Sequence, residues 1–530
     1  MLLTRPVAYG DRGMVATPHY LGSGAALNVL RDGGNAIDAA ITAAATLGTV
    51  LPHMTGIGGD AFWLIYNAKS NTLHGIDGSG PAGRNISPER FDRSQGIPER
   101  GAKSSLTVPG AVDSWRLAHS RFGSLPFTRL LEPAIDYARE GTPVTAGIAG
   151  WIRDSKTALE EDPGASAIFL NGGVEPKQGA RLFQHALANT LTDIAANGCR
   201  YFYDNTARDI TNYLQSRGGM LSLEDFVEYQ AEWVNPISVK YRNYEAFQLP
   251  PPSQGIAGLM MLNYLQHTNI SEYEYDSPEY YNLLLKAIRW ALKRRDRWLT
   301  DPKFLDIPIN NLLDPHEAEM AVKGEIVTPE APPKKNRLGK DTVFIATADV
   351  EGNAVGLVQS LYYDFGAAVL DPETGVLLQN RGAGFSLDPS HPNVLAPGKK
   401  SATTLMAGML FRDGRPYMVH GTQGGDVQAQ TNVSVVSRVV DFNLDVQQAI
   451  EAPRVLYGRS WGDAADQLLI ETRAGDSTLD AVSSEGRPAT GVAWPHPRMG
   501  TAQAIRLSNS ENSFLEGGAD PRGEGIALGF

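Results

Sequence analysis

The 530-residue chain contains a single cysteine and no long apolar run. One thiol, Cys199, excludes an intramolecular disulfide and a thiolate-rich metal site, and we expect it to be idle. No stretch reaches the roughly 18 apolar residues of a membrane-spanning helix. The start, MLLTRPVAYGDRGMV, lacks the continuous apolar core of a secretory signal. These absences predict a cytoplasmic protein without a membrane partner.

Positive charge and the common catalytic motifs are also scarce. The 59 acidic residues outnumber the 47 basic ones, and no Lys/Arg cluster is interleaved with aromatics, so a nucleic-acid surface is not expected. HExxH, GxxxxGK[ST], GxSxG and paired CxxC are missing, which leaves zincin, P-loop, serine-hydrolase and zinc-ribbon functions without support. We therefore expect a small-molecule partner and no metal or organic cofactor.

The first 300 residues have the apolar spacing of helices. SGAALNVLRDGGNAIDAAITAAATLGTVLPH predicts two helices, with Asn35 able to cap the second. DAFWLIYNAKSNTLHGIDG predicts a hairpin of two strands around a polar turn. From Leu125 to Thr300 the pattern is mostly helical, interrupted by the strand-like NPISVKYRNYEAFQLPPP. The apolar content of 42% is sufficient for a large core.

The composition changes abruptly near residue 340. Residues 321–341 are polar, charged and proline-bearing, which is typical of a mobile surface linker. TVFIATADVEGNAVGLVQSLYYDFGAAVLDPETGVLLQN then predicts several consecutive strands, PYMVHGTQGG another strand, and VQAQTNVSVVSRVVDFNL a helix. Helices first and sheet later favour a layered α+β or αββα arrangement.

The junction between linker and strand places a hydroxyl residue, Thr342, at the start of a buried strand. If the chain were cut before it, Thr342 would carry a free α-amino group with a pKa of about 7.7 to 8.0. Such an amine can accept the proton of its own hydroxyl near neutral pH, so one residue supplies nucleophile and base. Threonine is also common in strands, so a purely structural role stays open.

Seven segments in order resemble the γ-glutamyltranspeptidase family of N-terminal-nucleophile hydrolases, over residues 13–457. They are GGNAIDAAITAAATLGTVLPHMTGIGGDAFWLIY, SLTVPGAVDSWRLAHSRFGSLPF, PAIDYAREG, NPISVKYRNYEAFQLPPPSQG, TVFIATADVEGNAV, TGVLLQN and GTQGGD. The resemblance implies a four-layer αββα sandwich. It also implies a precursor that cuts itself between Asp341 and Thr342, giving a large subunit 1–341 and a small subunit 342–530. The two would form a heterodimer, and a dimer of heterodimers stays open.

The resemblance also implies roles for residues around the nucleophile. Gly424 and Gly425 fall where the family places its oxyanion-hole amides, before a helix whose N-terminal dipole adds positive potential. Ser360 aligns with the threonine that hydrogen-bonds the nucleophile. Thr403 and Thr404 replace the serine pair beside the substrate. Without the family, the glycine pair would be read as an ordinary strand-to-helix turn.

The family's clamp for the glutamate α groups is not retained. Its arginine position falls at Ser79, its acidic pair at Ala383 and Gly384, and its asparagine at Tyr362. A charge-assisted hydrogen bond contributes roughly 1.5 to 3 kcal/mol, and several are lost together. Val343 stands where the family usually has a second threonine, directly after the nucleophile. We therefore expect ordinary γ-glutamyl transfer to be poor and another small amide to be hydrolysed.

QNRGAGFSLDPSHPNVLAPGKK resembles a γ-glutamyltransferase-like branch that includes oxamate amidohydrolase. Arg381 could present its guanidinium to a substrate carboxylate, or could pair with a structural carboxylate instead. His53 is a weaker candidate, since most lone histidines are structural. The alternatives are a γ-glutamyl hydrolase or transferase acting on glutathione, an acylase of larger amides, and an inactive binding module.

Overall fold

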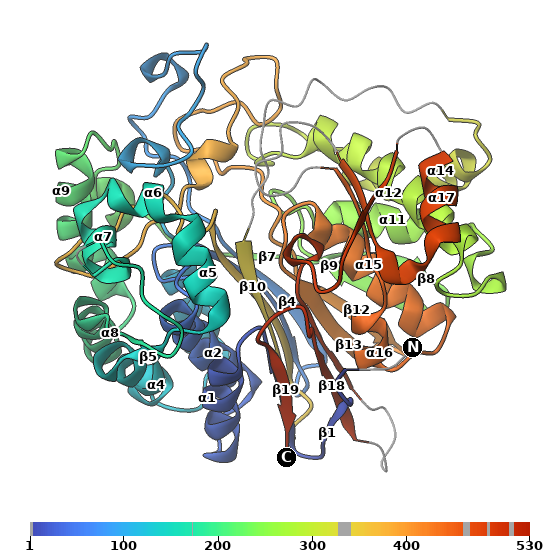
Figure 1. The fold of residues 1–530 in the computed structure, drawn as a ribbon, viewed down its shortest axis with the longest axis horizontal. Coiled ribbons are helices and arrows are strands. Elements are labelled where there is room, and N and C mark those ends of the chain that lie inside the picture. Colours follow the sequence, from blue (N-terminus) through green and yellow to red (C-terminus); the bar gives the residue numbers. More distant parts are fainter. Residues whose placement is uncertain (1–3, 172, 327–340, 459–466, 485–487, 508–513) are drawn as a thin grey trace.

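The computed structural model describes residues 4–171, 173–326, 341–458, 467–484, 488–507 and 514–530 (Figure 1). Two seven-stranded antiparallel sheets pack face to face, and helices cover the outer face of each sheet. The α+β, four-layer αββα arrangement expected from the sequence is confirmed. Among the described residues, no helix combines the length and apolar character needed to cross a membrane.

The strands of each sheet come from distant parts of the chain. In spatial order, the first sheet contains β1 (Ala8–Gly10), β18 (Leu515–Ala519), β17 (Ala502–Arg506), β13 (Arg415–Thr422), β12 (Gly408–Arg412), β9 (Tyr244–Gln248) and β8 (Ile237–Tyr241). The second contains β19 (Ile526–Gly529), β2 (Gly13–Thr17), β10 (Asp341–Asp349), β11 (Ala354–Tyr362), β3 (Asp60–Asn67), β4 (Thr72–Gly78) and β7 (Glu232–Val234). Both sheets therefore combine strands from before and after residue 341.

The helices form two separate groups. Helices α1 to α10 share one apolar core with the outer face of the second sheet. They are α1 (Tyr20–Arg31), α2 (Ala36–Val50), α3 (Ala111–Phe122), α4 (Phe127–Glu140), α5 (Ala146–Asp154), α6 (Lys156–Glu160), α7 (Pro163–Phe169), α8 (His185–Asn197), α9 (Ala207–Ser216) and α10 (Leu223–Val227). The other group packs on the first sheet. It contains α11 (Gly255–Gln266), α12 (Pro278–Trp298), α13 (Ile309–Leu312), α14 (Pro315–Val322), α15 (Val427–Asp441), α16 (Val446–Glu451) and α17 (Asp476–Ser484).

Local sequence explains the elements nearest the site. Asn35 caps α2 with a full capping box, in which Asp38 bonds back to the Asn35 N–H. The helix is buried along its whole length, as its alanine-rich sequence predicted. The hairpin β3–β4 is confirmed, as are β8, β9 and α15. Between the sheets, Phe344 of β10 packs with Val419 of β13, and the start of α15 meets the start of β10 where Gln428 lies beside Thr342.

Two predictions need correction. The run of strands predicted after β11 ends at Tyr362, and residues 363–380 form only isolated bridges, Leu370 with Leu377 and Leu378 with Gly58. Phe365 and Ala368 have positive φ angles of 58° and 53°, which interrupt the extended backbone. The predicted linker 321–341 is too long at both ends, because α14 continues to Val322 and β10 begins at Asp341. Its residues 327–340 lie outside the described part of the chain.

Candidate active site

Thr342 is the second residue of β10, and its side chain is buried. The strand pairing shifts there: Asp341 lies opposite Tyr362, but Val343 lies opposite Gln359. Two residues of β11, Ser360 and Leu361, therefore face the single Thr342, which is the arrangement of a β-bulge. Bulges re-aim a side chain and are common beside active sites. The predicted cut, between Asp341 and Thr342, falls at this irregularity.

The segment opposite Thr342 is held in an unusual conformation. Tyr362 has a φ of +83°, a region that residues with a Cβ seldom occupy, and its N–H donates to Ser360 Oγ at 2.8 Å. The Tyr362 ring stacks on Tyr363 with centroids 4.9 Å apart. A Cβ on Gly384 would lie 3.0 Å from the Tyr362 hydroxyl. The tyrosine thus lies against one of the positions where the family has an acidic residue.

The glycine pair lies between β13 and α15. Gly424 and Gly425 have φ angles of +119° and +62°, which glycine adopts without steric cost. Their carbonyls accept the first N–H groups of α15, from Val427 at 3.1 Å and from Gln428 at 3.1 Å. In the described part of the chain, neither glycine N–H donates a hydrogen bond. Two amide donors are therefore available at a helix N-terminus.

Gln428 connects this helix to Thr342. Its side-chain Nε2 lies 3.5 Å from Thr342 Oγ1, the outer limit of a hydrogen bond, and both side chains are buried. The first turn of α15 thus brings the glycine pair and Thr342 together. This pairing of a hydroxyl with backbone amides at a helix start is what acyl transfer requires.

A buried polar network contacts the Gly425 carbonyl and the neighbouring Asp426. Gln254, the N-cap residue of α11, donates its Nε2 to the Thr404 carbonyl at 2.8 Å and to the Gly425 carbonyl at 3.0 Å. Arg295 of α12 donates its Nη1 to Gln254 Oε1 at 2.7 Å and to Asp426 Oδ1 at 2.6 Å. The network joins the predicted substrate segment at Thr404 to the predicted oxyanion segment.

Arg381 pairs with a structural carboxylate, which is one of the two alternatives that the sequence left open. Its Nε donates to the buried Asp60 carboxylate, and its Nη1 donates to Thr403 Oγ1 at 2.8 Å. Burial raises the pKa of Asp60, while the Arg381 guanidinium and Gln379 oppose that rise. Arg381 Nη2 is buried without a hydrogen-bond partner among the described residues. One donor of the guanidinium is therefore left for a further acceptor.

The remaining clamp position, Ser79, is bound to the protein itself. Its hydroxyl and N–H both donate to Asp77, at 2.5 and 2.8 Å. Asp77 in turn pairs with Lys400 at 2.8 Å, and Lys400 also pairs with Glu232 at 3.3 Å. Burial lowers the pKa of Lys400, but these two carboxylates reverse the effect and raise it overall. The charged side chains beside Ser79 are thus paired with one another.

His53 contacts the segment that follows β11 through its backbone. Its carbonyl accepts from the Phe365 N–H at 2.8 Å, and the next carbonyl, of Met54, accepts from Leu361 N–H at 3.2 Å. The imidazole stacks on Trp151 with centroids 5.6 Å apart. Burial lowers the pKa of His53 to about 3, so the ring is neutral. It lines a cavity of about 240 Å³, called here the His53 cavity.

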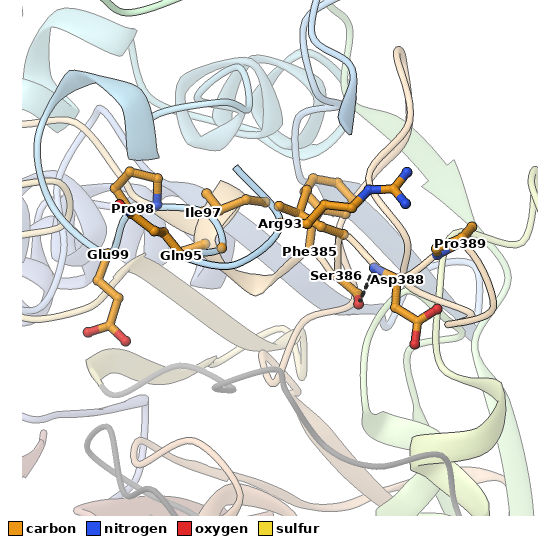
Figure 2. Close-up of a pocket in the computed structure, with 12 residues that line it drawn as sticks. Arg93, Gln95, Ile97, Pro98, Glu99, Phe385, Ser386, Asp388 and Pro389 are labelled. Carbon is orange, nitrogen blue, oxygen red and sulfur yellow. Dashed lines mark hydrogen bonds between the residues drawn. The ribbon is translucent and has the colours of Figure 1, made fainter. Parts of the chain in front are cut away.

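A larger hollow of about 630 Å³ borders the Arg381–Gly384 turn. Residues 93–99 form one wall and residues 383–389 the other (Figure 2). Within it, the Asp388 N–H donates to Ser386 Oγ at 3.1 Å. Of the predicted site positions only Ala383 lines this hollow. It therefore adjoins the site without containing the predicted nucleophile or oxyanion glycines.

The contacts connect the predicted residues through side chains that the sequence did not single out. Gln254, Arg295, Asp60 and Gln428 make these connections. Gln254 and Gln428 occur within or beside motifs that carry the resemblance, PPPSQG and GTQGGD, but their letters alone gave them no role. Arg295 is one basic residue among several in α12, and only its full burial distinguishes it.

Comparison with known proteins gives the same family throughout. The family model described as gamma-glutamyltranspeptidase matches residues 22–530. The chain is 41% identical over 522 residues to the glutathione hydrolase-like YwrD proenzyme of Bacillus subtilis, covering 98% of this chain and 99% of that protein. It is 37% identical to the oxamate amidohydrolase proenzyme of Klebsiella pneumoniae, covering 98% of each.

A solved structure extends the likeness to the whole fold. The cephalosporin acylase from Bacillus halodurans has a TM-score of 0.91 and 33% identity, covering 100% of this chain and 98% of that one. The fold is thus the sandwich of the N-terminal-nucleophile hydrolases, and the chain belongs to the γ-glutamyltranspeptidase family.

Proposed function

We propose that this protein is a self-processing amidohydrolase that hydrolyses a small, oxamate-like amide through an acyl-enzyme on Thr342. The observation that carries the proposal is the meeting of Thr342 with the first turn of α15. The Thr342 hydroxyl lies beside Gln428, and the N–H groups of Gly424 and Gly425, which donate no hydrogen bond among the described residues, lie just before the same helix. Relatives named as proenzymes of hydrolases support it.

Maturation would begin at the bond between Asp341 and Thr342. The Thr342 hydroxyl attacks the Asp341 carbonyl, the C–N bond breaks, and the acyl group moves to the threonine oxygen as an ester. Water then hydrolyses the ester, which leaves an Asp341 carboxyl and a free Thr342 amine. The products are a large subunit 1–341 and a small subunit 342–530, which stay together because both sheets contain strands of each.

In the catalytic cycle the free amine of Thr342 takes the proton of its own hydroxyl. The oxygen attacks the substrate carbonyl, and the N–H groups of Gly424 and Gly425 stabilise the oxyanion. The C–N bond breaks, and the leaving amine departs with the proton held by the Thr342 amine. Water repeats the sequence on the ester, so the net reaction consumes one water and yields an acid and an amine.

The substrate class follows from Arg381 and Tyr362. Arg381 Nη2, which has no partner among the described residues, suits one carboxylate, and Thr403 offers a hydroxyl beside the same guanidinium. The acidic and asparagine side chains that would hold a glutamate ammonium are replaced by Ala383, Gly384 and Tyr362. A short acyl group with a carboxylate and no ammonium therefore fits best, and an oxamate amidohydrolase among the relatives supports this choice.

Two alternatives of the same class remain distinguishable by assay. A glutathione hydrolase or transferase is favoured by one relative's name and an acylase of larger amides by the name of the solved structure. Turnover of oxamate, glutathione and a γ-glutamyl anilide by the matured protein separates these functions. An inactive binding module would give one uncut chain by intact mass and no turnover of any of the three.

A further inference from the structure

The His53 cavity adjoins both parts of the proposed catalytic machinery. One wall contains Leu51, His53 and Met54, and the Met54 carbonyl accepts from the N–H of Leu361, which faces Thr342 across the bulge. Another wall contains Gln423, which directly precedes the glycine pair and donates its N–H to the Thr501 carbonyl at 3.3 Å. A molecule in this cavity would lie next to the segments that carry nucleophile and oxyanion donors.

Three buried side chains of the cavity wall carry polar atoms without a partner in the described part of the chain. They are His53 Nδ1, Gln423 Oε1 and Thr501 Oγ1, on residues that are 2%, 3% and 6% exposed. Buried polar atoms in folded proteins are nearly always hydrogen-bonded to protein, water or ligand. Three such atoms from separate segments around one cavity indicate a site for a hydrogen-bonding molecule.

The rest of the wall suits a flat apolar group. Trp151 of α5 stacks on the His53 ring with an interplanar angle of 19°, and Leu51, Met54 and Ile148 also line the space. Aromatic rings favour stacked or edge-on aromatic partners. The cavity volume of about 240 Å³ is smaller than a drug-sized pocket, so it fits a small fragment.

The charges around the cavity disfavour an anion. The Arg522 guanidinium is fully paired with Glu471 at 2.6 Å and Asp520 at 3.0 Å. Glu524, which is partly exposed, adds a carboxylate at the rim, 3.6 Å from His19 Nε2. Burial lowers the pKa of His19 to about 4, so that ring is neutral near pH 7. The cavity therefore favours a neutral or cationic group, the opposite of the Arg381 neighbourhood.

We propose that the His53 cavity binds the amine part of the substrate, a primary amine with a small apolar or aromatic body. This inference rests on the proposed acyl-enzyme function. An amide joins an acyl part and an amine part. The Arg381 neighbourhood suits the carboxylate of the acyl part, and the His53 cavity suits a neutral or cationic amine part. The carboxylate of the acyl part would approach Arg381, and the amine part would contact Trp151, Gln423 and Glu524. N-substituted oxamates are then better substrates than oxamate.

Benzylamine tests the cavity without any turnover. We expect calorimetry on the matured protein to detect benzylamine binding that weakens at least about tenfold in Trp151→Ala, because the ring loses its stacking partner. Glu524→Gln should weaken it severalfold. Trp233→Ala, on the edge strand β7, is the matched control and should bind as the wild type does. Absent binding, or equal binding in Trp151→Ala, overturns the inference.

N-benzyl oxamate and oxamate then connect the cavity to the reaction. Trp151→Ala should lower kcat/KM for N-benzyl oxamate at least about tenfold and leave that for oxamate within about twofold. Hydrolysis of oxamate with rejection of N-benzyl oxamate overturns the inference but leaves the proposed function intact. If neither compound is hydrolysed by protein whose chain has been cut before Thr342, the proposed substrate class is wrong. Benzylamine binding alone then tests the inference about the cavity.

Discussion

The network behind the glycine pair gives the sharpest prediction, through the substitution Gln254→Met. Methionine is close to glutamine in length and shape but has no amide. The change removes two donations, to the Thr404 and Gly425 carbonyls, and the acceptor for Arg295 Nη1. Neutral hydrogen bonds contribute about 0.5 to 1.5 kcal/mol each and one to a charged group about 1.5 to 3 kcal/mol. The sum, about 2.5 to 6 kcal/mol, is an upper limit because the three share one side chain.

The catalytic loss should be separable from the loss of stability. Removing one oxyanion donor typically costs about 10²- to 10³-fold in kcat. Gln254→Met keeps the Gly425 N–H and removes only one of the two hydrogen bonds accepted by the Gly425 carbonyl, so we expect a smaller fall, about 10- to 100-fold in kcat, with little change in KM. The assay is steady-state hydrolysis by protein already cut into two chains, with thermal unfolding measured on the same samples.

Two companion variants make the result interpretable. Gln266→Met, at the other end of α11, removes an acceptor for the Arg242 N–H and should cost stability without lowering kcat. Gln254→Glu keeps an acceptor for Arg295 but loses both donations, and serves if the methionine variant does not fold. Matured Gln254→Met with wild-type kcat would refute the idea that this network positions the oxyanion donors.

Three further predictions test the remaining groups. Thr342→Ala should give a single chain on a denaturing gel and no amide hydrolysis, and two chains with full turnover would refute the assigned nucleophile. Arg381→Met leaves the Asp60 carboxylate buried without its partner, so a stability loss of about 3 to 5 kcal/mol is expected by calorimetry, whereas an unchanged midpoint would contradict the ion pair. The folded pKa of His53, about 3, lies below its unfolded value of 6.5, so protonation favours the unfolded state as pH falls through this window. Relative to His53→Gln, the wild type should lose about 1.6 kcal/mol between pH 6.5 and 5, measured by unfolding at each pH.

The sequence predicts local elements well where one pattern decides them. Asn35 and the alanine-rich run after it specify a capped, buried helix, and alternating residues around a polar turn specify β3 and β4. Strand partners cannot be obtained this way, because a period of two fixes which face of a strand is buried but not its neighbour. β1 pairs with β18, about 500 residues away in sequence, and nothing local indicates that pairing.

The site residues also differ in whether local sequence predicts them. Thr342 could be proposed because its chemistry depends on one residue and the bond before it. The conformation of Tyr362 could not, since a positive φ at tyrosine contradicts its propensity and is imposed by the surrounding packing. Arg381 illustrates the intermediate case. Its position indicated a carboxylate partner, but only the buried contacts show that Asp60 takes one donor and Thr403 another.

The proposed cut passes through the middle of this site, and that placement constrains how it works. Gln254 and Arg295 precede residue 341, whereas Thr404, Gly425 and Asp426 follow it. If the chain is cut as proposed, side chains of the large subunit position the proposed oxyanion segment of the small one. Because these contacts are already formed in the uncut chain, scission needs to change only the terminus at Thr342. The same amide donors can then serve first the ester formed from Asp341 and afterwards the acyl group of the substrate.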